Sequence, residues 1–135
     1  MINLYIFSNK SRGGLYGVGT YIRELITALR SKSNSIHIHV VHILCDQLQI
    51  EKKEVKDVSY WYSPEPISKE WNLLDQEQRK VYSRNIVYLL RNYIQDQKNL
   101  VFHLNSYRDK SLALELKIAF DCKVITVTHF SEWSS

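Results

Sequence analysis

The chain has 135 residues, of which 44% are hydrophobic, 24% charged and 12% aromatic, with a formal net charge of +4. These proportions are typical of a globular domain and exclude collagen-like, coiled-coil and disordered chains. A chain of this length can bury one substantial core, and its longest apolar runs fall well short of the ~20 residues that a membrane-spanning helix needs. We therefore expect a single domain over residues 1–135 with no membrane-spanning segment.

The first half of the chain alternates between strand and helix patterns. Short apolar runs at residues 2–7, 35–44 and 58–62 predict strands, the last of them stopped by Pro64 and Pro66. Between the first two runs, apolar residues recur at helical spacing from Val18 to Leu29 and predict an amphipathic helix that ends near Ser31. Residues 46–57 carry several charges and no helical stripe, so we expect a loop with at most an irregular strand there.

The second half continues the alternation. A helical stripe lies between residues 73 and 97, and Asp75 and Gln78 have the spacing of a capping box at its start. A strand at residues 100–104, a helix over Leu112 to Phe120 and a strand at residues 124–127 follow. The order β-α-β-(β)-α-β-α-β predicts an α/β fold, because parallel strands need crossover connections that place helices on both faces of the sheet. Cys45 would follow one strand and Cys122 precede another, so we expect free thiols.

All four glycines of the chain, at positions 13, 14, 17 and 19, lie between the first strand and the first helix. Glycine lets a ligand approach the main chain, and the N-terminus of a helix presents unpaired N–H groups that favour phosphate. The first 32 residues also carry five basic residues against Glu24 alone, which indicates an anionic partner. A flexible surface loop and an incomplete dinucleotide fingerprint, with Ile22 at the third glycine position, are the alternatives; a P-loop is excluded because no Gly-Lys-Ser/Thr triplet occurs.

Two segments resemble the N-terminal domain of the family-four glycosyltransferases, retaining enzymes with two Rossmann-like domains. The first runs from Gly13 to Leu25 and reads Gly-Gly-Leu-Tyr-Gly-Val-Gly-Thr-Tyr-Ile-Arg-Glu-Leu. The second is the strand Lys-Val-Ile-Thr-Val-Thr-His-Phe, residues 123–130, which looks like the family's later strand ending in a His. The resemblance implies that the predicted parallel sheet is Rossmann-like.

The resemblance also implies an activity: transfer of a sugar from a nucleotide-diphospho-sugar to the hydroxyl of a sugar or lipid-linked acceptor, with retention. Gly13, Gly14 and Gly17 would approach the donor diphosphate, and His129 would be the catalytic residue. Acceptor-side candidates are His103, Ser131, Glu132 and Trp133. No metal and no resident cofactor are implied, because the nucleotide-sugar is a substrate.

One expected feature of that family is missing. Its donor site lies mainly in a second domain with two glutamates in the pattern Glu-x7-Glu, and no pair of glutamates in this chain has that spacing. We therefore expect residues 1–135 to be a truncated, acceptor-side N-terminal domain that lacks its C-terminal partner domain and is inactive alone. The alternative is a non-catalytic phosphate- or nucleotide-binding α/β module.

Other polar and aromatic residues allow both functional and structural roles. His37 and His39 share one face of a strand and His42 the other, with no ligand at suitable spacing to complete a metal site. Trp61 and Trp71 could stack on sugars, although large aromatic residues more often lie in a core.

The distribution of charge and the N-terminus bear on location and partners. Lys80, Arg84, Arg91 and Lys98 form a basic stripe that suits either solvent or an anionic membrane surface. No nucleic-acid motif is present. Because residues 1–7 lack the charge and cleavage pattern of a signal peptide, we expect a cytoplasmic protein with peripheral membrane contact as an option.

Overall fold

The structure is a computed structural model that describes residues 1–9, 17–32, 35–45, 51–64, 74–94, 98–105 and 110–127. Its elements in chain order are β1 (Ile2–Asn9), α1 (Gly17–Lys32), β2 (Ile36–Cys45), β3 (Glu51–Val55), β4 (Val58–Pro64), α2 (Gln76–Tyr93), β5 (Leu100–Leu104), α3 (Lys110–Phe120) and β6 (Lys123–Thr126). None of the helices in these ranges is both long and apolar enough to cross a membrane.

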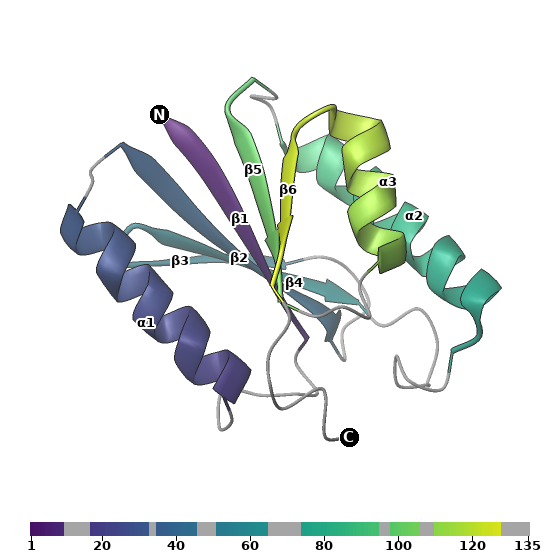
Figure 1. The fold of residues 1–135 in the computed structure, drawn as a ribbon, viewed down its shortest axis with the longest axis horizontal. Coiled ribbons are helices and arrows are strands. Elements are labelled where there is room, and N and C mark those ends of the chain that lie inside the picture. The colour runs from purple at the N-terminus through teal and green to yellow at the C-terminus, as the bar shows by residue number, and fades with distance from the viewer. Residues whose placement is uncertain are drawn as a thin grey trace.

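The strands form one sheet in the order β3-β4-β2-β1-β5-β6 (Figure 1). Only β3 is antiparallel to its neighbour; the other four pairings are parallel. When β3 is left out, the parallel strands lie in the order third, second, first, fourth and fifth, which is the order of a Rossmann fold. The predicted α/β class with a Rossmann-like sheet is therefore confirmed.

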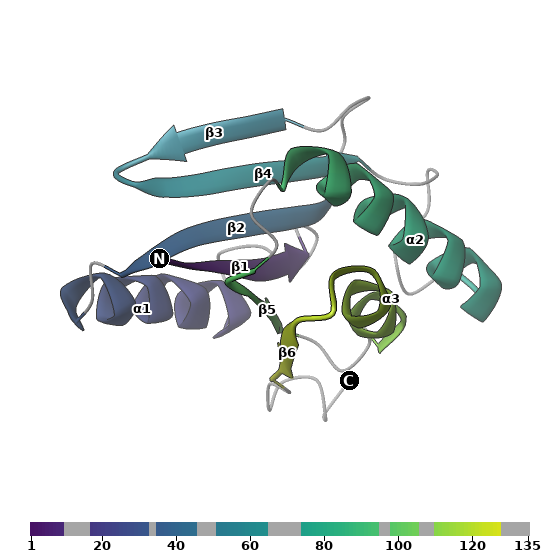
Figure 2. The same ribbon diagram turned by 90° about the horizontal axis from the view of Figure 1, so that it is seen from above.

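The helices cover both faces of the sheet and create two cores. On one face α1 packs on Ile6, Ile38, Val40 and Val58 through its buried residue Ile22. On the other face α2 and α3 lie side by side (Figures 1 and 2) over a larger cluster. That cluster includes Phe7, Val41, Trp61, Ile86, Leu90, Phe102, Leu104, Leu112 and Leu116. Side chains of β1, β2 and β4 alternate between the two cores, as the period of two in a strand requires.

The helix start predicted from Asp75 and Gln78 is confirmed. Gln78 N donates to Asp75 Oδ1 at 2.8 Å, and Asp75 N donates to Gln78 Oε1 at 3.0 Å. This reciprocal pair satisfies two backbone donors that a helix N-terminus would otherwise leave exposed. It fixes the point at which α2 begins.

The prediction of a loop over residues 46–57 is wrong for residues 51–55, which form β3. All five residues of β3 are exposed, so no apolar pattern predicted it. The strand exists because it pairs with β4 through a two-residue turn, Lys56 and Asp57, whose φ angles of 50° and 67° are both left-handed. Positive φ at both positions matches the twist of a tight hairpin, but neither residue is the Gly or Asn that usually signals one.

Cys122 is a free thiol, as expected. It is half-buried, and burial together with the carboxylate of Asp121 raises the pKa of that thiol. The side chain of Cys45 lies outside the described part of the structure.

Candidate functional site

The candidate site lies where the strand order reverses, between β1 and β5. β1 pairs with β2 along its whole length from Ile2 to Asn9, but with β5 only from Asn3 to Ile6. The last residues of β1 therefore continue past the end of its ladder with β5. Open parallel sheets bind their ligands at such a point, at the carboxyl ends of the strands, and we call this edge between β1 and β5 the crevice.

His103 and Tyr21 meet beside this crevice. His103 is the last residue of β5 paired with β1, lies opposite Ile6 and is buried. Its Nε2 lies 3.3 Å from the hydroxyl of Tyr21, and the two rings stack with centroids 6.0 Å apart. This contact joins residues 82 positions apart and ties the beginning of α1 to the end of β5.

The N-terminus of α1 lies at the same edge of the sheet, because α1 follows β1 in the chain (Figure 1). α1 has no acidic residue in its first turn and carries Arg30 and Lys32 in its last turn. The positive end of its dipole is therefore not opposed by a carboxylate of its own first turn. Such an end attracts anions.

Asn105 bridges the two diverging strands. It directly follows β5, is buried, and its Nδ2 donates to the backbone oxygen of Phe7 at 3.0 Å. This side-chain bond connects β1 to the end of β5 one step beyond the last backbone pair, Ile6 and His103. Asn105 thus holds the base of the crevice together while the strands separate.

Two of the residues predicted from sequence are described at this edge. Gly17 is the first residue of α1, and His103 lies at the crevice as stated. Gly13, Gly14, His129, Ser131, Glu132 and Trp133 lie outside the described residues. The last described residue before His129 is Val127, whose N–H donates to the oxygen of Leu104 at 2.8 Å, so β6 runs alongside β5 to this edge.

Sequence reasoning missed Tyr21 and Asn105. The helical pattern places Tyr21 only in the apolar stripe of α1, although its hydroxyl sets it apart from the other members of that stripe. Asn105 does carry a usable signal, because it is a polar residue immediately after a buried strand. Residues at that position of a parallel strand face the ligand edge of the sheet.

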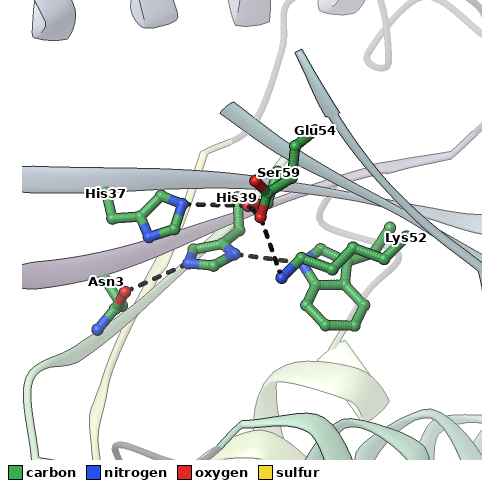
Figure 3. Close-up of polar contacts among 7 residues, drawn as sticks. Asn3, His37, His39, Lys52, Glu54 and Ser59 are labelled. Atoms are coloured by element: carbon green, nitrogen blue, oxygen red, sulfur yellow. Dashed lines mark hydrogen bonds and ion pairs between the residues drawn. The ribbon is translucent and has the colours of Figure 1, made fainter. Parts of the chain in front are cut away.

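A second polar cluster lies near the amino ends of the strands, on the face covered by α2 and α3 (Figure 3). Trp61 Nε1 donates to His39 Nδ1 at 3.2 Å, so the remaining nitrogen, Nε2, carries the proton and donates to Asn3 Oδ1 at 3.3 Å. The His39 ring also stacks on Tyr5 with centroids 4.0 Å apart. Burial, followed by the nearby His37 and Lys52, lowers the pKa of His39 to about 3, so the imidazole is neutral.

The same cluster continues to the hairpin. His37 Nε2 donates to Ser59 Oγ at 3.1 Å, and that hydroxyl donates to Glu54 Oε1 at 3.4 Å. Lys52 Nζ lies 3.3 Å from the same carboxylate oxygen. The hydrogen bond and the positive charge of Lys52 lower the pKa of Glu54. Ser59 is fully buried, and its hydroxyl donates a hydrogen bond to Glu54. It is therefore unsuited to act as a nucleophile even though it contacts a histidine.

The histidines of β2 do not assemble a metal site. Both ring nitrogens of His39 are occupied by Trp61 and Asn3, and His42 faces away and stacks on Tyr60 and Tyr62. Across the described ranges, no three His, Cys, Asp or Glu side chains gather closely enough to hold an ion. Trp61 is buried beneath Lys52, whose Nζ lies 4.9 Å from the ring centroid, so it is a core residue and not a platform for sugars.

A pocket of about 520 Å³ opens at the amino edge beside this cluster, lined by Met1, Arg30, His37, Glu54 and Asp57 among others. It lies at the opposite end of the sheet from the crevice. Open α/β sheets bind their ligands at the carboxyl ends of the strands, where helix N-termini and strand ends converge. We therefore place the candidate functional site at the crevice and assign no ligand to the pocket.

The sheet order and the helices on both faces define a Rossmann-like domain, and solved structures agree. An OtsA structure without ligand superposes with a TM-score of 0.65 and 9% identity, over 96% of this chain and 33% of that chain. An E. coli structure described as trehalose-6-phosphate bound with UDP-2-fluoro glucose gives 0.63 and 11%, over 92% and 32%. Trehalose-6-phosphate synthase, studied with bisubstrate glycomimetics for glycosyl transfer with retention, gives 0.55 and 12%, over 85% and 29%.

At these identities the likeness establishes the fold. This chain spans about a third of the length of the solved structures that it matches. No family model and no curated protein matches its sequence. The fold implied by the resemblance, a Rossmann-like parallel sheet with helices on both faces, is confirmed.

Proposed function

We propose that this chain forms the acceptor-side, N-terminal Rossmann-like domain of a retaining glycosyltransferase that uses a nucleotide-diphospho-sugar donor. The observation that carries the proposal is the agreement of nearly the whole chain with trehalose-6-phosphate synthase structures, one of which holds a UDP-sugar analogue. The glycine cluster before α1 and the crevice beside His103 support the same proposal from the chain's own residues.

The proposed chemistry assigns a task to each part of the crevice. The donor's diphosphate gains negative charge as the glycosidic bond breaks, and backbone N–H groups in a water-poor site stabilise that charge. Gly13, Gly14 and Gly17 would admit the diphosphate to the backbone beside the positive end of α1. His129 would contact the sugar or orient the acceptor hydroxyl, and His103, Ser131, Glu132 and Trp133 would line the acceptor side.

The proposal also requires a second domain. This chain spans a third of its structural neighbours and has no Glu-x7-Glu pair with which to hold the donor. We propose that this second half is supplied by further polypeptide and that residues 1–135 alone do not transfer sugar. A coding sequence that continues beyond residue 135 into another α/β domain with paired glutamates would support this arrangement.

The second candidate function is a non-catalytic module that binds phosphate or a nucleotide. The glycine cluster favours it as much as it favours the enzyme, because both need an anion at the N-terminus of α1. Binding assays test what the two functions share, and transfer assays separate them.

The binding experiment titrates the 135-residue chain with UDP, GDP and inorganic pyrophosphate while amide chemical shifts are recorded by NMR. We expect shifts in the residues around α1 and β5, and a loss of roughly tenfold or more in affinity for Gly14→Val, since one charge-assisted hydrogen bond or more is blocked. Thr27→Val is the control, because Thr27 is an exposed residue of α1. Equal affinities in the two variants would contradict the role of the glycine loop.

The transfer experiment incubates the chain, and any longer polypeptide from the same gene, with UDP- and GDP-sugars and analyses the products. Sugar transfer by the longer polypeptide alone supports the enzyme. Diphosphate binding without transfer by either polypeptide supports the module. Transfer by the 135-residue chain would overturn the requirement for a second domain.

A further inference from the structure

Four large apolar side chains protrude from the helical layer formed by α2 and α3. The exposed fractions are 53% for Val81, 69% for Tyr88, 58% for Leu114 and 69% for Ile118. Each of these side chains costs free energy while it is in water. A face that carries several of them needs an explanation that single scattered residues do not.

Helix geometry directs all four side chains away from the sheet. Val81 and Tyr88 are seven residues apart on α2, and Leu114 and Ile118 are four apart on α3, so each pair lies on one side of its helix. The opposite sides of the two helices are buried against the sheet through Ile86, Leu90, Leu112 and Leu116. α2 and α3 pack together, with Arg84 Nε 3.3 Å from Glu115 Oε1 across the seam. The four residues therefore belong to one surface, which we call the outer α2–α3 face.

The helical layer that bears the outer α2–α3 face is also basic. The two helices carry six basic residues, Arg79, Lys80, Arg84, Arg91, Lys110 and Lys117, against the two acids Glu77 and Glu115. Five of the six basic residues are exposed; Arg79 is half-buried. Residues 33–135 as a whole are balanced, with 13 basic and 13 acidic residues, so this excess is local. The layer with the protruding apolar side chains therefore also carries a local excess of exposed positive charge.

We propose that the outer α2–α3 face binds the surface of a bilayer that contains anionic lipids. Anionic headgroups would attract the exposed cations, and the aliphatic tips would enter the boundary between headgroups and acyl chains. Tyr88 suits that depth, because tyrosine prefers the membrane interface. The aliphatic stems of lysine and arginine can extend along apolar surface so that their charged groups reach the headgroups.

The chemistry of the face favours lipid over a macromolecular partner. A single-stranded nucleic acid would need several exposed aromatic rings for its bases, and of the four protruding side chains only Tyr88 is aromatic. An acidic protein would need a complementary groove, whereas these side chains project individually among charges. The fluid headgroup region of a bilayer accommodates separate protruding side chains without shape complementarity. This inference does not depend on the proposed transferase activity.

The experiment measures flotation of the 135-residue chain with vesicles of phosphatidylcholine alone and with about 30% phosphatidylserine. We expect binding only to the anionic vesicles, with loss of binding in high salt. Tyr88→Ser with Ile118→Ser should weaken binding without a change of charge. Failure to bind anionic vesicles, or equal binding to both compositions, would overturn the proposal.

Two matched variants separate a local surface from the overall charge of the protein. Lys80→Gln with Arg91→Gln removes two positive charges from the outer α2–α3 face, and Arg30→Gln with Lys32→Gln removes two from exposed positions at the end of α1, on the other side of the sheet. We expect the first pair to lower the partition coefficient by roughly tenfold or more and the second pair to change it much less. Equal losses, or stronger capture by an acidic protein or RNA than by vesicles, would contradict the proposal. Circular dichroism of each variant checks that the fold is intact.

Discussion

Two buried histidines on opposite faces of the sheet have different surroundings. On the face covered by α2 and α3, His39 lies in the interior of the central strand β2, and both of its ring nitrogens are bonded to other side chains. On the face covered by α1, His103 is the last residue of β5 paired with β1, and it contacts a tyrosine of α1. The first histidine is enclosed by ladders on both sides, whereas the second lies where a ladder ends.

This difference indicates which histidine contributes stability and which is available for binding. A buried polar group contributes to a unique fold when its bonds are satisfied, as those of His39 are. A group near a strand end can exchange a protein partner for a ligand without disrupting a ladder. We therefore expect variants in the cluster around His39 to change the free energy of unfolding, and variants around His103 to change ligand affinity.

The largest effect should follow from removal of Trp61. This buried side chain donates to His39, lies under Lys52 and contacts Tyr93 edge to face with centroids 5.5 Å apart. Trp61→Ala removes these contacts and leaves a cavity, so we expect the free energy of unfolding to fall by about 3–5 kcal/mol, measured by urea denaturation.

Trp61→Phe is the companion variant. It keeps most of the ring volume and loses the N–H bond to His39, so its loss should be smaller, roughly 1–3 kcal/mol for an unsatisfied buried acceptor. A loss below about 1 kcal/mol for Trp61→Ala would show that the cluster around His39 does not stabilise the fold in the way we describe.

The next largest loss of stability should follow from protonation of His39 in acid. The pKa of His39 is about 3 in the folded chain against an ordinary value of 6.5, so at intermediate pH the unfolded chain binds a proton that the folded chain does not. Stability from this residue is fully present above pH 6.5 and is lost as the pH falls from there toward 3. At about pH 5 the loss should be about 2 kcal/mol, at roughly 1.36 kcal/mol for each pH unit below the ordinary pKa.

The measurement compares the free energy of unfolding at about pH 7.5 and about pH 5 in the parent chain and in His39→Gln. Glutamine can accept from Trp61 and donate to Asn3, but it does not titrate. The variant should therefore lose less stability on acidification than the parent. Equal losses in the two proteins would assign the acid sensitivity to other groups.

The elements of the fold could be predicted because most of them bury an apolar face. The stripe that contains Ile22 and the run that contains Phe102 each satisfy a helix or strand period, and Asp75 and Gln78 mark the start of a helix. β3 could not be predicted, because its exposed residues form a strand only through pairing with β4. The cause of this strand therefore lies in β4 and not in the residues of β3 itself.

The candidate site could be predicted only in part for the same reason. His103 is recognisable because it lies near the end of a strand, and Gly17 because it begins a helix. The contact between Tyr21 and His103 depends on the crossover that brings α1 beside β5, and no local pattern encodes a pairing across 82 residues. The network of His37, Ser59 and Glu54 is likewise set by the register of three strands.

The smallest change in stability, and the sharpest test of the contrast, should come from Tyr21→Phe on the face covered by α1. The variant keeps the ring that stacks on His103 and removes the hydroxyl 3.3 Å from its Nε2. Tyr21 is half-buried, so the loss in the free energy of unfolding should not exceed about 1 kcal/mol. Because this hydroxyl ties the start of α1 to the end of β5, its loss should weaken UDP binding by roughly three- to tenfold.

The control for this variant is Trp61→Phe, which should lower stability more and leave UDP affinity unchanged under conditions where both proteins are folded. NMR titration gives the affinities, and urea denaturation gives the stabilities. If the two variants lowered UDP affinity equally, the effect would be transmitted through stability of the whole sheet, and the crevice would have no separate role. If only Tyr21→Phe did so, the contact between α1 and β5 would be distinguished from the rest of the sheet by function, because removal of one partly exposed hydroxyl would affect binding more than the loss of a buried hydrogen bond on the opposite face.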